Sequence, residues 1–132
     1  MASILRVNTL TDASSNNSIA TSFVAGGSAK AWIDIPAGLG SINASFNVSS
    51  LDDDGAGDGG INYTSSMSSA TYSIQGTSED ASTSVSARIC DITQNTAATG
   101  TVDFELYSVS SSVNRTNSDS QRAFLTIHGD LA

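Results

Sequence analysis

The sequence predicts an all-β fold, an antiparallel β-sandwich of the jelly-roll or Ig-like type with an extended N-terminal arm. Three observations predict it. Apolar residues recur at every second position of several short runs, and Gly, Asn, Ser and Asp cluster between those runs. No stretch keeps the 3.6-residue period of an amphipathic helix. With 132 residues, the chain has room for one domain with a modest core.

The first 27 residues differ from the rest of the chain. The stretch "ILRVNTL" could form one short strand, but "TDASSNNSIATSFVAGGS" is too polar and too rich in glycine to pack by itself. We interpret residues 1–27 as an extended arm for docking and oligomerisation, which becomes ordered against a partner chain. Residues 28–132 are then the sandwich domain. A frayed terminus is the alternative interpretation of the arm.

The sandwich domain should consist of half-buried antiparallel strands, in which alternate residues share one face. They are expected near residues 28–36, 42–51, 61–67, 71–78, 84–92, 101–110 and 122–129. In three of these strands, one face collects the apolar residues, namely Ile42, Ala44, Phe46 and Val48, then Val102, Phe104 and Leu106, then Ala123, Leu125 and Ile127. Clusters of turn-forming residues separate the strands.

Two large aromatic residues fall on outward faces. Trp32 lies opposite the apolar face of "AKAWIDI", and Phe124 alternates with the core-facing Leu125. An outward aromatic residue is either a surface side chain or an interface anchor, and large apolar residues on both faces of two strands favour oligomerisation. The residues predicted for an oligomer interface are Ile4, Leu5, Val7, Leu10, Trp32 and Phe124.

The stretch "LDDDGAGDGG", residues 51–60, looks like a calcium loop in its composition. Its spacing excludes an EF-hand, because position 5 counted from Asp52 is Ala56 and position 12 is Tyr63, where oxygen ligands are required. Alternating strands on both sides and four glycines favour the solvent-exposed turn of a hairpin. A looser calcium site built from Asp52, Asp54 and Asp58 is the alternative. No other metal or cofactor is expected.

No catalytic set is recognisable, and we do not expect the chain to be an enzyme. His128 is the only imidazole and Cys90 the only thiol, so a nucleophile–base pair of Cys and His would require these two residues to meet. The sequence has no G-x-S-x-G motif. Asp103 and Glu105 point to one face of one strand, as on an ordinary solvated sheet. We interpret Cys90 and His128 as structural residues.

The net charge of −8 comes from five basic and thirteen acidic residues. It disfavours binding to nucleic acid and to anionic lipid, whose phosphates repel an acidic surface. No run approaches the roughly 18 apolar residues of a spanning helix, and "MASILRVNTL" lacks the pattern of a signal peptide. We expect a protein that is made in a cytoplasm and does not insert into membranes.

Four motifs resemble, in their order, a small module of tailed bacteriophage virions that is widespread in marine phages. They are "SILRVNTLTDASS", "GSAKAWIDI", "SFNVSSLDDDGAGD" and the closing "LTIHGDLA". The resemblance spans nearly the whole chain and weakens between about residues 65 and 120. Its motifs are structural and not catalytic.

The resemblance implies a virion structural protein, namely a short tail fibre, a tail-tip knob, or a head-surface fibre or capsid decoration. Such proteins are commonly homotrimers. The chain would then assemble with other virion proteins in the host cytoplasm and aid host adhesion. The alternative function is a receptor- or carbohydrate-binding module, in which loops 52–60 and 112–120 contact host surface glycans and calcium assists at the acidic loop.

Overall fold

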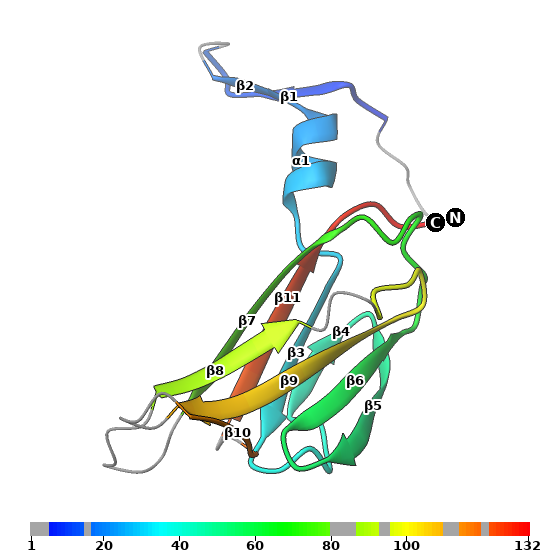
Figure 1. The fold of residues 1–132 in the computed structure, drawn as a ribbon. Coiled ribbons are helices and arrows are strands. Elements are labelled where there is room, and N and C mark those ends of the chain that lie inside the picture. Colours follow the sequence, from blue (N-terminus) through cyan, green and yellow to red (C-terminus); the bar gives the residue numbers. More distant parts are fainter. Residues whose placement is uncertain (1–5, 15–16, 80–86, 93–95, 110–113, 120–121) are drawn as a thin grey trace.

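Figure 1 shows the computed structural model of the chain, in which two antiparallel sheets pack against each other and a smaller N-terminal unit stands off one end. The structure describes residues 6–14, 17–79, 87–92, 96–109, 114–119 and 122–132. Within these ranges, the helix α1 has seven residues, and no helix is long and apolar enough to cross a membrane. The predicted all-β sandwich is confirmed.

One sheet has four strands in the order β4-β3-β11-β7. They are β3 (Ala31–Pro36), β4 (Ala44–Phe46), β7 (Ser73–Glu79) and β11 (Arg122–His128). The other sheet has the order β10-β9-β6-β5, and β8 also pairs with β9. Its strands are β5 (Val48–Gly55), β6 (Asp58–Tyr63), β8 (Ala87–Ile92), β9 (Thr101–Val109) and β10 (Arg115–Asn117).

The core lies between the two sheets and is built from alternate strand residues. Alternate residues of β11 and of most of β9 are buried, as the sequence predicts. The buried apolar side chains are Ala31, Ile33, Ile35, Leu39, Ile61, Tyr63, Met67, Val102, Phe104, Leu106, Ala123, Leu125 and Ile127. Because all of them lie between residues 31 and 127, the sandwich has a core that does not include the arm.

The segment predicted as one strand, residues 42–51, is two strands in different sheets. Asn47 stands between β4 and β5 with a φ of 55°, in the left-handed region. Its Nδ2 donates to the Ser65 carbonyl at 3.0 Å, and the Ser65 N–H donates to its Oδ1 at 2.7 Å. Because the chain turns this corner, Val48 packs on the core whereas Phe46 is 52% exposed. The prediction that both residues share one face is therefore wrong.

Most of the other strand boundaries lie within a few residues of the prediction. The strand expected at 61–67 is β6, which begins and ends earlier, at Asp58 and Tyr63. Residues 84–86 of the strand expected at 84–92 lie outside the described residues, and β8 begins at Ala87. The short β10 was not predicted, because the three residues of "RTN" contain no apolar alternation.

The N-terminal arm contains a hairpin and a helix. The hairpin strands are β1 (Thr9–Thr11) and β2 (Ser18–Ala20), and α1 (Thr21–Gly27) follows directly. The helix was not predicted, because "TSFVAGG" ends in two glycines and has no helical period. Lys30, which follows the C-terminal end of α1, stabilises the helix, since its ammonium donates to the carbonyls of Ala25 and Ser28. A cation at a helix C-terminus is favourable there. Figure 1 shows this unit above one end of the sandwich.

Candidate functional site

The acidic stretch forms a hairpin, as the alternating strands around it predict. β5 pairs with β6, and the chain reverses between Gly55 and Asp58, which are register partners. Asp52 to Asp54 lie within β5 and not in the turn. The Asp52 Oδ2 accepts a hydrogen bond from the Asn62 Nδ2 of β6 at 2.7 Å. Part of the acidic stretch is thus strand and is bonded across the hairpin.

The geometry does not gather the carboxylates predicted as calcium ligands. Asp52 and Asp54 come from β5, and Asp58 begins β6. Among the residues that the structure describes, no group of three or more Asp, Glu, His or Cys side chains could hold a metal ion. The calcium site stays a prediction of the sequence.

The turn of this hairpin packs against another loop at Gly57, so the prediction of a solvent-exposed turn is wrong at that residue, whereas Gly55 and Ala56 are exposed as predicted. Gly57, Gly59 and Gly60 are buried. The Gly57 N–H donates to the Asp119 Oδ1 at 2.8 Å, and the Gly57 carbonyl accepts the Leu106 N–H at 2.6 Å. A Cβ on Gly57 would lie 2.2 Å from the Leu106 carbonyl oxygen. The turn is therefore tightly packed at Gly57 and exposed at the two residues before it.

The outer face of the five-stranded sheet is acidic. Asp58 on β6 and Asp91 on β8 flank Glu105 on β9, because each of them is its register partner. Arg115 of β10 forms an ion pair with Glu105 and stacks on Tyr107, with 4.1 Å between the guanidinium carbon and the ring centroid. Three neighbouring carboxylates give this face a negative potential.

The outer face of the four-stranded sheet carries three aromatic rings. Trp32 on β3 pairs with Phe46 on β4, and Phe124 on β11 pairs with Asp34, which makes it a diagonal neighbour of Trp32. Trp32 is 39% exposed. The predicted outward orientation of Trp32 and Phe124 is confirmed. Phe46 was missed, because the corner at Asn47 reverses the face that its alternation with Val48 predicts.

An ion pair borders these rings. The Arg122 Nε and Nη2 donate to the Asp34 Oδ1 and Oδ2 at 2.8 Å and 2.5 Å. The guanidinium carbon also lies 5.0 Å from the Phe124 ring centroid. The hydrogen bond from Arg122 lowers the pKa of Asp34, so the pair is ionised at neutral pH. We call Trp32, Phe46, Phe124, Asp34 and Arg122 the aromatic face.

The two residues considered for catalysis do not form a pair. Cys90 on β8 packs against the core, and a Cβ on Gly76 of β7 would lie 2.5 Å from its sulfur. Burial, and then the charge of Asp91, raises the pKa of the Cys90 thiol to about 12, so the thiol is protonated at neutral pH. His128 lies on the outer face of β11, since its neighbour Ile127 is buried. Cys90 and His128 therefore offer no nucleophile–base pair.

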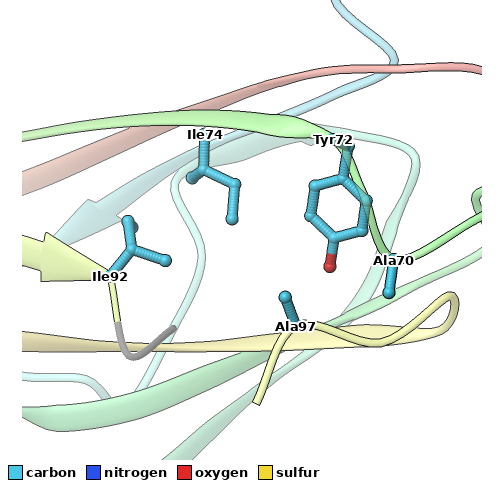
Figure 2. A pocket seen from close by; sticks show the side chains of 5 residues that line it. All are labelled: Ala70, Tyr72, Ile74, Ile92 and Ala97. Atoms are coloured by element: carbon cyan, nitrogen blue, oxygen red, sulfur yellow. The ribbon is translucent and has the colours of Figure 1, made fainter. Parts of the chain in front are cut away.

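A pocket of about 280 Å³ lies between β7 and β8. Its lining residues are Ala70, Tyr72, Ile74, Ile92 and Ala97, and Figure 2 shows their side chains around the opening. At Gly76 and Cys90 the two strands are in close contact. Ile74 and Ile92, two residues along each strand, line the space beyond that contact. We call this space the edge pocket.

Tyr72 gives the edge pocket a fixed wall. Its hydroxyl donates to the carbonyl oxygens of Ala98 and Thr101, at 2.9 Å and 3.0 Å. Its ring meets the Tyr63 ring edge to face, with 5.9 Å between the centroids. Burial and the neighbouring Tyr72 raise the pKa of Tyr63, which stays neutral. Apart from the Tyr72 hydroxyl, which is bonded to the backbone, the lining side chains are apolar, whereas polar atoms make up about half of the pocket surface.

The arm exposes several apolar side chains. They are Val7 (39%), Leu10 (43%), Ile19 (44%), Phe23 (74%) and Val24 (42%). The helix α1 has no buried residue. Two of the predicted interface residues, Val7 and Leu10, are thus available to a partner, whereas Ile4 and Leu5 lie outside the described residues. Phe23 was missed in the sequence, because its polar and glycine-rich surroundings did not indicate a helix.

Comparison of the chain with protein-family models, with curated proteins and with solved structures finds no match. The sandwich fold, the exposed arm, the aromatic face and the edge pocket are therefore the observations from which function is inferred.

Proposed function

We propose that the protein is a non-enzymatic structural subunit of a bacteriophage virion, a short tail fibre, knob or head-surface fibre that assembles as a homotrimer through its N-terminal arm. The virion role is supported by the resemblance of the four sequence motifs to phage modules. Assembly through the arm is supported by one structural observation, the apolar surface that the arm leaves in water. The arguments below concern that surface.

The arm has too little internal packing to be stable by itself. A two-stranded hairpin is at best marginally stable in water, and helices shorter than about 12 residues are marginal even in favourable sequences. β1 and β2 have three residues each and α1 has seven, and their apolar side chains are 42–74% exposed at Leu10, Ile19, Phe23 and Val24. Burial against a partner would supply the missing stabilisation.

The distribution of charge favours contact through the arm. Residues 1–27 contain one acidic residue, Asp12, and one basic residue, Arg6, so the arm has no net charge. Residues 28–132 contain the other twelve acidic and four basic residues and carry the whole charge of −8. Arms can therefore meet without the repulsion that opposes contact between sandwiches.

The aromatic face favours a second function, adhesion to host glycans. Exposed rings such as Trp32 and Phe46 can stack on the apolar faces of sugars, and a fixed ion pair such as Asp34–Arg122 can bond to hydroxyl groups. Loops 52–60 and 112–120 are the alternative site for this adhesion, because residues 52–56 and 114–117 are exposed although Gly57 is buried. Adhesion by the sandwich is compatible with assembly by the arm.

Light scattering on the full chain and its variants tests the assembly. We expect the wild type to have three times the 13.4 kDa of one chain. The double variant Phe23→Ser/Val24→Ser should have the mass of one chain with an unchanged β-type circular dichroism spectrum. Ile89→Ser is the matched control, since Ile89 is 37% exposed but belongs to β8 of the sandwich and not to the arm, and it should leave the mass unchanged.

A wild-type chain that is monomeric at high micromolar concentration would contradict the proposed assembly. In light scattering, Trp32→Ala should keep the mass of the trimer. On a glycan array, the same variant should lose the binding that the wild type shows. Loss of the trimer would instead assign the aromatic face to the subunit interface. Mass spectrometry of purified particles of the encoding phage should detect the chain, and its absence from those particles would contradict the virion role.

A further inference from the structure

We propose that Phe23 of one subunit inserts into the edge pocket of a neighbouring subunit. This inference rests on the arm-mediated assembly proposed above, and it names the contact that holds the subunits together. It connects two features of the single chain, an exposed aromatic ring on the arm and an open pocket lined mostly by apolar side chains.

The edge pocket suits an apolar group of the size of one phenyl ring. The side chains of Ala70, Ile74, Ile92 and Ala97 are apolar, and Tyr72 presents its ring while its hydroxyl is bonded to the backbone. An enclosed apolar cavity of about 150 Å³ is sufficient to bind benzene, and this pocket of about 280 Å³, which is open on one side, has room for a phenylalanine side chain. The space lies just below the roughly 300–1,000 Å³ of ordinary small-molecule sites.

Phe23 is the matching group on the partner. At 74% exposure it is the most exposed large apolar side chain of the described residues, ahead of Phe46 at 52%. It projects from α1, whose C-terminal end is bonded to Lys30 at the base of the arm. Aromatic anchors that fill a pocket on the partner dominate the energies of many interfaces. Since Phe23 is exposed on its own subunit, its own edge pocket does not hold it.

The edge pocket lies at the end of the sandwich from which the arm leaves. Ile127 of β11 pairs on one side with Ala31, the first residue of β3, and on the other with Ile74, which lines the pocket. The base of the arm and the pocket are therefore two strand spacings apart, about 10 Å. Subunits that meet through their arms would bring the pocket of one close to the helix of the next.

The contact has a direction, since a ring on one subunit enters a pocket on the next. Such a head-to-tail contact generates a closed ring when the rotation between subunits closes. In a trimer, all three copies of Phe23 and all three pockets would be used. The same contact would leave the aromatic face outside the interface.

Disulfide trapping tests the contact. The variant Phe23→Cys/Ala97→Cys, oxidised as the full chain, should give covalent dimers and trimers on a non-reducing gel. Each single variant is a control, and neither should give the ladder, because Cys90 is partly buried, packed against Gly76 and protonated at neutral pH. As a second measurement, Ala97→Phe should fill the pocket and raise the dissociation constant of the assembly at least tenfold. Its unfolding should stay cooperative.

The outcomes separate this inference from the proposed function. Intermolecular crosslinks together with weakened assembly in Ala97→Phe support the contact. Intramolecular crosslinks overturn it, since Phe23 would then fill the pocket of its own chain. A wild-type trimer that dissociates in Phe23→Ser/Val24→Ser but gives no crosslink and tolerates Ala97→Phe also overturns the contact, and it leaves arm-mediated assembly intact. A monomeric wild type overturns both.

Discussion

Replacing Gly57 with alanine should lower the free energy of unfolding by about 3–5 kcal/mol, as measured by urea denaturation. Two effects add. Gly57 has a φ of 71°, where a Cβ is strained, and that Cβ would lie 2.2 Å from the Leu106 carbonyl oxygen and 2.6 Å from the Ser118 nitrogen. Both neighbours are backbone atoms, so the junction of the hairpin with the loop before β11 must open to make room.

Alanine variants of two other glycines separate the cost of backbone strain from the cost of the steric clash. Gly55 has a φ of 140° but open space where its Cβ would lie, so Gly55→Ala should cost only the backbone strain, about 1–2 kcal/mol. Gly40 has neither a positive φ nor a close neighbour, and Gly40→Ala should be within about 0.5 kcal/mol of the wild type. Equal stability of the Gly57 and Gly40 variants would show that the turn is not packed as described.

Replacing Asn47 with alanine should lower the free energy of unfolding by about 2–3 kcal/mol, because it removes two hydrogen bonds to Ser65 and places a strained residue at a φ of 55°. Denaturant unfolding followed by tryptophan fluorescence measures the loss. The variant Asn47→Gly permits the left-handed backbone and removes only the hydrogen bonds, so it should recover about 1 kcal/mol.

Asn43 provides the matched control for the corner. Its side chain makes one long contact, 3.5 Å from the Asn43 Nδ2 to the Asp34 Oδ1, and it lies just before β4. Asn43→Ala should change the free energy of unfolding by less than about 0.5 kcal/mol. If Asn43→Ala and Asn47→Ala cost the same, the corner at Asn47 does not stabilise the change of sheet.

The sequence predicted those parts of the fold that depend on local alternation. Val102, Phe104 and Leu106 are buried in β9, and Ala123 and Leu125 in β11, because a two-residue period with one apolar face has few other solutions. The same reasoning failed at Asn47. Whether an asparagine adopts a positive φ is decided by its bonds to Ser65, a residue 18 positions away, and no local pattern reports that contact.

The candidate site was less predictable because its parts come from distant segments. The edge pocket borders the close contact of Gly76 with Cys90, and the sequence marks Cys90 as the only thiol without indicating that it meets Gly76. The buried turn at Gly57 depends on Asp119, 62 residues further along the chain. The outward position of Trp32 was predictable, since its neighbours Ala31 and Ile33 alternate with it on a single strand.

The uneven division of charge gives the proposed assembly an unusual dependence on its medium. Three like-charged sandwiches joined through neutral arms would push one another apart in dilute buffer. Salt screens this repulsion, because the Debye length falls from about 10 Å at 0.1 M salt to about 3 Å at 1 M. Subunit association should therefore tighten as salt is added, whereas complexes held by ion pairs loosen. The same trimer would therefore hold its sandwich domains apart at low salt and close together at high salt.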